Sequence, residues 1–203
     1  MKKTILILIL SVVITYSQDY KISHKSYTYA AQKPKMEFLF NYPQIKGFSS
    51  VTAMNMFNKH IENIVYATSD TFKVWMRDWD TISTEHEMGS YYEAGDSVYY
   101  ASNELVSVQF YEGYYFSGAA HPNNSSFTVN YDLVNFKELT LNDVLKTGWV
   151  NKISEICVKD LREQKNVTPE TLDDWIQSGA GPDEKNFKVF NITKNGLLIT
   201  FIT

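Results

Sequence analysis

The sequence predicts an α+β fold, an antiparallel sheet with helices packed on one face. The first observation is a helical apolar pattern between Val51 and Thr68. The second is a block of short aromatic and β-branched runs within residues 88–131, which favours antiparallel hairpins over parallel βαβ units. The third is the order of the elements: strands, one helix, the β block, more helices and a last hairpin. That order suits helices gathered on one side of a sheet.

Two strands are expected before the long helix. Residues 22–32 alternate loosely between apolar and polar side chains, and residues 33–35 interrupt them around Pro34. Met36–Tyr42 predicts a second strand, which is expected to end at Pro43 because a proline restricts the backbone of the residue before it.

The long helix is expected to begin at a cap formed by Ser49 or Ser50. Its apolar side chains recur at three- and four-residue steps, and we assign them to the core: Val51, Met54, Phe57, Ile61, Ile64, Val65 and Thr68. The pattern continues to Met76, with a break expected near Ser69-Asp70.

The rest of the chain alternates between strand and helix patterns. In the β block we expect strands over residues 91–92, 98–100, 106–116 and 127–131, with turns at 94–97, 102–104 and 118–125. Beyond it we expect helices at 144–145, 149–161 and from 168–170 to 178–179, and a hairpin of residues 187–192 and 197–202.

The first seventeen residues have the composition of a secretory signal peptide. Met1-Lys2-Lys3 is followed by an apolar run from Ile5 to Ile14, which is little more than half of the roughly 20 residues of a membrane span. We expect cleavage after Ser17, and a retained N-terminal anchor is the alternative. We therefore divide the chain into a signal peptide (1–17), an N-terminal part (18–83) and a C-terminal part (84–203). Because the chain stops within the apolar pattern of residues 197–202, we expect either a well-paired last strand or a truncated sequence.

The charge and the cysteine content exclude two classes of protein. Removal of residues 1–17 leaves 17 basic residues against 23 acidic ones, a net charge of −6, which gives no general attraction for nucleic acid. Cys157 is the sole cysteine, so a disulfide-stapled scaffold is excluded and the fold depends on packing. Cys157 occupies an apolar position of a predicted helix and is expected to be buried.

The candidate site is a strand of bulky aromatic residues that runs into four small residues and a His-Pro pair. We expect this loop and strand to bind a ligand through Tyr114, Tyr115, Ser117, Gly118, His121, Pro122 and Asn123. An enzymatic interpretation would use His121 as a base for Ser117, or as a zinc ligand. The plainer interpretation is a turn whose histidine bonds a neighbouring carbonyl, because no acidic or histidine partner stands at a recognised spacing. We predict no catalytic residue and no metal ligand.

These residues resemble a known family. Tyr115–Asn123, Asn130–Leu133 and Glu138–Leu145 are similar to the signature of the domain of unknown function 3298, roughly Y-x-G-G-A-H-P-N, N-Y-D-L-x-T-G-K and L-T-L-x-D-L-F. Upstream, Phe40–Ile45 and Phe57–Ile61 are similar to the companion domain of unknown function 4163. The two domains occur in tandem in the extracytoplasmic half of the anti-sigma factor RsiV and ahead of some peptidoglycan deacetylase domains. The resemblance spans about residues 22–203.

The resemblance implies an envelope-facing α+β module, and in the anti-sigma branch it implies lysozyme binding. Three departures limit what it implies here. Ala119 replaces the second glycine of the motif, residues 134–137 replace the T-G-K turn, and the family's closing segment would lie beyond Thr203. The chain also has no sigma-binding part and no deacetylase domain, so neither activity is carried over.

We therefore expect an exported binding module of the cell envelope, periplasmic, secreted or on the cell surface, rather than an enzyme. Its expected partner is a cell-wall protein such as lysozyme, or a peptidoglycan glycan, met by the tyrosine-rich strands 91–115 and the loop 117–124. We expect no cofactor, no nucleic acid and no membrane span after signal cleavage. Two alternatives stay open: a hydrolase or metal-dependent enzyme that uses His121, and a non-catalytic structural domain of a longer chain.

Overall fold

The computed structural model describes residues 19–80, 89–165 and 173–201. In chain order its elements are β1 (Lys21–Gln32), β2 (Lys35–Lys46), α1 (Val51–Asp80), β3 (Ser90–Ala101), β4 (Leu105–Tyr115), β5 (Asn123–Asp132), β6 (Lys137–Glu138), α2 (Leu141–Val144), α3 (Trp149–Lys165), α4 (Asp173–Ala180), the 3-10 helix η1 (Glu184–Phe187), β7 (Phe190–Thr193) and β8 (Gly196–Ile199). The predicted signal peptide and the predicted start of the helix at 168–170 lie outside the described residues.

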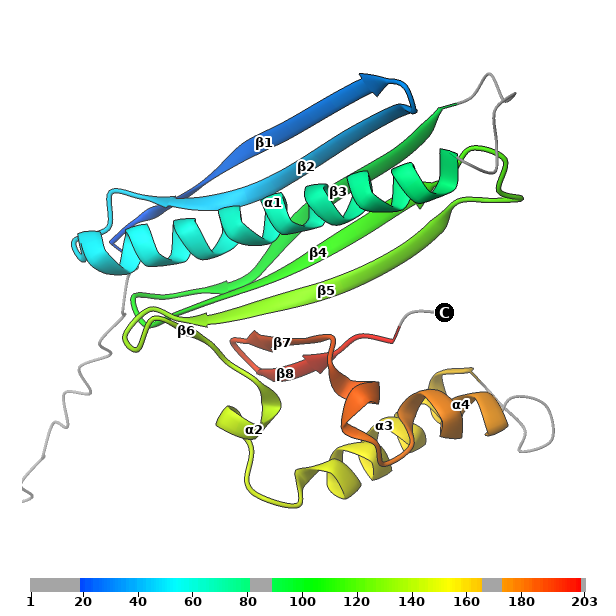
Figure 1. The fold of residues 1–203 in the computed structure, drawn as a ribbon. Coiled ribbons are helices and arrows are strands. Elements are labelled where there is room, and N and C mark those ends of the chain that lie inside the picture. The colour runs from blue at the N-terminus through cyan, green and yellow to red at the C-terminus, as the bar shows by residue number, and fades with distance from the viewer. Residues whose placement is uncertain (1–18, 81–88, 166–172, 202–203) are drawn as a thin grey trace, which may run out of the picture.

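A six-stranded sheet in the order β1-β2-β3-β4-β5-β6 forms the larger part of the fold, and α1 lies along one of its faces (Figure 1). The predicted α+β class, with an antiparallel sheet and a helix on one face, is confirmed with one difference. The strands β2 and β3 are parallel over Met36–Phe40 and Ser90–Ala94, and all the other neighbours are antiparallel. The reason is α1, which carries the chain back along the sheet before β3 begins.

The helix α1 begins at the predicted cap and continues without the expected break. The Ser50 hydroxyl accepts a hydrogen bond of 3.3 Å from the Ala53 amide, as an N-cap does. At Ser69 the helix stays intact, because Ser69 lies on the face that packs on the sheet, between the buried Val65 and Phe72. Within the described part of the chain, the helices are too short or too polar to cross a bilayer.

The main core lies between α1 and the sheet, and aromatic rings fill most of it. Phe38 stacks on Tyr92 with ring centroids 4.8 Å apart, and Phe110 stacks on Phe127 at the same separation. Phe40 meets Phe110 edge-on at 5.5 Å. Such pairs add about 0.5–1.5 kcal/mol each beyond the burial of their area. The aromatic richness of the sequence therefore serves the core first.

Two local predictions within the sheet were wrong, and tertiary pairing explains both. The strand β2 does not end at Pro43, because its pairing with β3 stops at Phe40 and one side of β2 is then unpaired, where a strand tolerates proline. The turn expected at residues 94–97 lies inside β3, which stays paired with β4 and shows only a register shift between Val98 and Tyr100.

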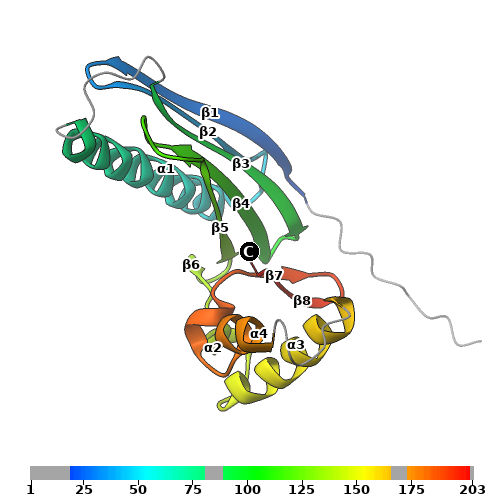
Figure 2. The ribbon, with the colours of Figure 1, turned by 90° about the vertical axis from the view of Figure 1, so that its right-hand side faces the viewer.

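A second, smaller cluster of apolar side chains lies under one end of the sheet. Its buried members are Leu141, Trp149, Phe187 and Phe190, and the apolar faces of α3 and the β7–β8 hairpin complete it. The predicted hairpin is confirmed, but it forms a separate two-stranded sheet in which β7 lies against β3, β4 and β5 (Figure 2). The boundary predicted at 83/84 falls inside the first cluster, between α1 and β3, and as a family boundary it stays a prediction.

Candidate functional site

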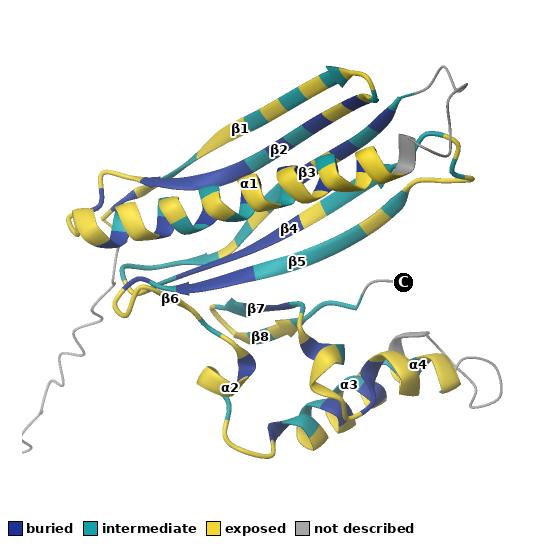
Figure 3. Cartoon of the chain, in the orientation of Figure 1, coloured by how far each residue is buried: buried dark blue, intermediate teal, exposed yellow. Residues whose placement is uncertain are grey.

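The sheet face that α1 leaves uncovered is the natural place for a site. Along β4, Val106, Val108 and Phe110 point into the core beneath α1, so Ser107 and Gln109 between them point to the other face. In Figure 3 residues 106–110 of β4 form one continuous buried stretch, whereas burial alternates along much of β1. At one end β7 covers this second face, and at the other end the face is open.

The covered end is held by a buried polar network. The Asn130 amide donates a hydrogen bond of 2.8 Å to the Phe190 carbonyl, and its oxygen accepts one of 3.0 Å from the Ile192 amide. Ser107 donates to Asn130 at 2.7 Å and accepts from Asn191 at 3.0 Å. These polar residues are 1% exposed or less, so their hydrogen bonds fix where β7 sits on the sheet.

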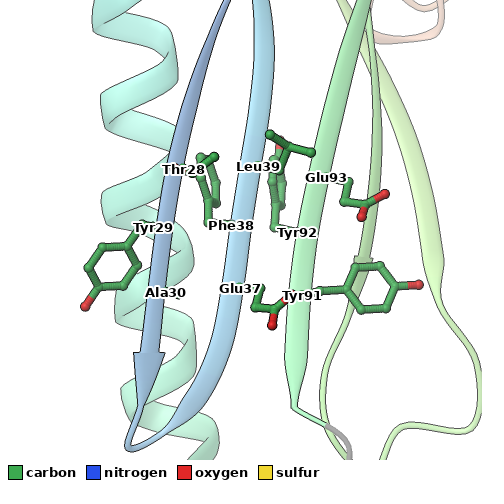
Figure 4. A pocket seen from close by; sticks show the side chains of 9 residues that line it. All are labelled: Thr28, Tyr29, Ala30, Glu37, Phe38, Leu39, Tyr91, Tyr92 and Glu93. Carbon is green, nitrogen blue, oxygen red and sulfur yellow. The ribbon is translucent and has the colours of Figure 1, made fainter.

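The open end carries two adjoining hollows. The first, of about 310 Å³, is lined by Thr28, Tyr29, Ala30, Glu37, Phe38, Leu39, Tyr91, Tyr92 and Glu93 (Figure 4). The second, of about 340 Å³, is lined by Leu39, Asn41, Glu93, Ala94, Gly95, Tyr111, Glu112, Gly113 and Asn124. Because Leu39 and Glu93 line both, the hollows form one depression across β1 to β5, which we call the sheet groove.

Two strand glycines form part of the floor of the sheet groove. A Cβ added to Gly95 would meet no atom within 4 Å, and one added to Gly113 would meet only Asn124 Oδ1, at 3.5 Å. Neither glycine has a positive φ. The fold therefore needs glycine at neither position, although glycine weakens a strand interior. What the two glycines provide is room for a close approach to the backbone.

Tyrosines and carboxylates surround this floor. Tyr91 stacks on Tyr115 with ring centroids 5.9 Å apart, and the hydroxyls of Tyr99 and Tyr111 lie 3.0 Å apart. Figure 4 shows Tyr91 and the exposed Glu93 projecting from β3 in one direction. None of the described residues that line the groove is a lysine, an arginine or a histidine.

The carboxylate of Glu112 is held on the core side of the sheet. It accepts hydrogen bonds from the hydroxyls of Tyr92 and Ser125. Burial raises the pKa of the Tyr92 phenol, and the hydrogen bond to Glu112 raises that pKa further. Tyr92 therefore stays protonated and donates its hydrogen bond to Glu112. Because the Glu112 carboxylate is engaged in these hydrogen bonds, the groove carboxylates that can meet a ligand are those of Glu37 and Glu93.

An ion pair lies where β2 and β3 separate. His24 Nε2 of β1 is 3.0 Å from Asp96 Oδ2 of β3, and the side chains are 56% and 2% exposed. Pairing between β2 and β3 has ended two residues earlier in β3, at Ala94. Burial raises the pKa of the Asp96 carboxyl, and His24 opposes that rise.

The structure distributes the predicted site residues over both faces and the β4–β5 turn. Tyr114 packs in the core against Tyr92 and Trp75, whereas Tyr115 joins Tyr91 beside the groove. The Ser117 amide donates to Ser90 Oγ at 2.8 Å, and Gly118 has a φ of +86°. Of these four residues, Tyr115 at the end of β4 is the one that lies beside the groove.

The remaining predicted residues lie at the tip of the turn and the start of β5. His121 is exposed, and its Nδ1 lies 2.9 Å from the carbonyl oxygen of Pro122, as in the plainer interpretation. Asn123 pairs with Tyr114 in the sheet. Among residues 19–80, 89–165 and 173–201, no three His, Cys, Asp or Glu side chains are grouped to hold a metal ion.

Glu37 lies outside the predicted binding surface. Glu93, Gly95, Gly113 and Asn124 fall within the predicted ranges 91–115 and 117–124, but they were not among the predicted site residues. The available signal was the presence of two glycines, Gly95 and Gly113, within strand-like stretches. Glycines in strands often mark the close approach of another backbone or a ligand. Gly95 was instead assigned to a turn.

Comparison with known proteins connects this fold to one family. Residues 142–203 match the family described as protein of unknown function (DUF3298). The matched DUF3298 segment includes α3, α4 and the β7–β8 hairpin, and the polar network joins it to the sheet. The predicted likeness of the N-terminal part to domain 4163 stays a prediction.

Two crystal structures of DUF3298 proteins share the fold. A DUF3298 family member from Bacteroides fragilis is 15% identical and superposes with a TM-score of 0.60, over 79% of this chain and 75% of that one. A DUF3298 family protein from Pseudomonas aeruginosa is 13% identical, with a TM-score of 0.51 over 88% of this chain and 80% of that one.

The chain is also similar to a bacterial enzyme that is named for its action on peptidoglycan. It is 25% identical over 169 residues, 82% of its length, to peptidoglycan-N-acetylmuramic acid deacetylase PdaC from Bacillus subtilis. The chain spans about a third of that protein, since the match covers 33% of the deacetylase.

Proposed function

We propose that this chain is an exported binding module of the cell envelope, and that the sheet groove binds a cell-wall glycan. One observation carries the proposal: a depression on the open sheet face, floored by glycines that packing does not require and flanked by tyrosines. Clefts with aromatic walls and a few polar groups are the usual form of small-ligand sites.

The envelope location is supported by two further features. The first seventeen residues have the order of a signal peptide, and the similar Bacillus protein is named for its action on peptidoglycan. The proposal concerns binding and assigns no catalytic step to the groove.

A substitution that fills the groove can test its role in binding without disturbing the rest of the fold. In Gly95→Val the added Cβ meets no atom within 4 Å, and valine suits a strand, so we expect the fold to be as stable or slightly more stable. The groove floor is filled by the same change. Gly179→Ala on α4, where an added Cβ also meets no atom within 4 Å, is the matched control.

The measurement is co-sedimentation with purified, insoluble peptidoglycan. The unaltered protein and Gly179→Ala are expected to sediment with the polymer, and Gly95→Val to bind at least about tenfold more weakly, a loss of about 1.4 kcal/mol. Absence of binding by the unaltered protein, or equal binding by folded Gly95→Val, overturns the proposal.

A further inference from the structure

We infer that the sheet groove recognises its glycan through protonated amino groups, so that it prefers chains whose N-acetyl groups have been removed. This inference rests on the proposed function and adds the chemical class of the ligand. The observation that supports it is the negative charge of the groove. Glu37 and Glu93 are exposed and line it, and no basic side chain among the described lining residues balances them.

The two carboxylates lie on neighbouring strands of the same face. Glu37 pairs with Tyr91, and Glu93 pairs with Leu39, two residues further along each strand. From strand spacing and rise, their Cα atoms are about 8 Å apart. A cation placed between or beside them is attracted by both carboxylates.

The nearest cations have other positions. Lys73 of α1 lies 4.6 Å from the centroid of the Tyr29 ring and 3.0 Å from Asp70, on the helix side of the sheet. Lys35 precedes Glu37 by two residues on β2 and lines neither hollow. Among the described residues, neither Glu37 nor Glu93 takes part in a salt bridge, so both carboxylates can meet a ligand.

The chemistry of a cell-wall glycan offers one matching group. An N-acetylated amino sugar is neutral at nitrogen, whereas the free amine left by removal of the acetyl group is a base that carries a positive charge when it is protonated. A protonated amine can donate charge-assisted hydrogen bonds to Glu37 or Glu93 and can rest on a tyrosine face such as that of Tyr91. The class of reaction that supplies such a ligand is amide hydrolysis on the glycan.

The test compares two oligosaccharides of equal length by isothermal titration calorimetry with the full chain. One is a tetramer of N-acetylglucosamine, and the other is a tetramer of glucosamine. Two exposed ion pairs predict that glucosamine tetramer binds about tenfold more tightly. The preference is expected to shrink as salt is raised.

Variants assign the preference to the groove. The double variant Glu37→Gln, Glu93→Gln keeps size and hydrogen bonding, and it is expected to bind the two tetramers equally. Glu104→Gln, an exposed carboxylate in the β3–β4 turn, is expected to keep the preference.

The outcomes separate the two proposals. If both tetramers bind equally to the unaltered protein, or the acetylated one binds more tightly, the amine inference is wrong while glycan binding stands. If the double variant keeps the full preference, the inference is also wrong. If trilysine binds as tightly as the glucosamine tetramer, charge alone is recognised and the inference is overturned. If neither tetramer nor peptidoglycan binds, the proposed function itself fails.

Discussion

The side-chain amide of Asn130 donates a hydrogen bond of 2.8 Å to the main-chain carbonyl of Phe190, which lies 60 residues further along the chain. The same side chain accepts from the Ile192 amide at 3.0 Å. The Asn130 side chain therefore offers β7 one donor and one acceptor, as the backbone of a neighbouring strand would. Through it, the DUF3298 segment is attached to the sheet by specific hydrogen bonds as well as by apolar contact.

We expect Asn130→Ala to lower the free energy of unfolding by about 1–3 kcal/mol, because buried partners on β7 are left without a hydrogen bond. Urea denaturation measures this change. Asn63→Ala, at an exposed position of α1, is the control and should stay within about 0.5 kcal/mol of the unaltered protein. Equal stability of the two variants would contradict the role given to Asn130.

The Asp96 carboxyl should make stability depend on pH in an unusual direction. Its pKa is raised by burial, so between the ordinary carboxyl pKa of about 4 and the raised folded value the folded state binds more protons than the unfolded chain. The contribution of Asp96 to the free energy of unfolding is therefore complete at low pH and falls as pH rises through that window.

Asp96→Asn removes this titration and keeps an oxygen for the His24 ring. Its stability relative to the unaltered protein is thus expected to rise as pH increases above about 4, and then to level off. Chemical denaturation across this pH range measures the difference. A constant difference between the two proteins at all pH values would show that Asp96 does not titrate as described.

His121 is expected to contribute little to stability. Its side chain is exposed and its ring bonds the carbonyl of the next residue, so His121→Ala should change the free energy of unfolding by less than about 0.5 kcal/mol. Peptidoglycan binding should also persist in the variant, since the groove lies on the sheet. Stoichiometric zinc in the purified protein that disappears in His121→Ala would instead favour the enzymatic alternative.

The short-range signals were sufficient for most of the elements. Apolar spacing and Ser50 placed α1, and aromatic and β-branched runs placed most of the strands, although β3 was divided by a turn that does not form. Each of these depends on neighbours within about one helical turn or one strand, so the chain itself carries the information.

The site required information of another kind. The alternation of β4 places Phe110 and Gly113 on opposite faces of the sheet, but it does not say which face α1 or β7 will cover. The parallel pairing of β2 with β3, the continuation of β3 through Gly95 and the bond from Asn130 to Phe190 all join segments distant in the chain. Sequence periodicity by itself determined the helix, the strands and their two-faced character. Only the tertiary structure decided which face stayed open, because covering a face depends on long-range packing.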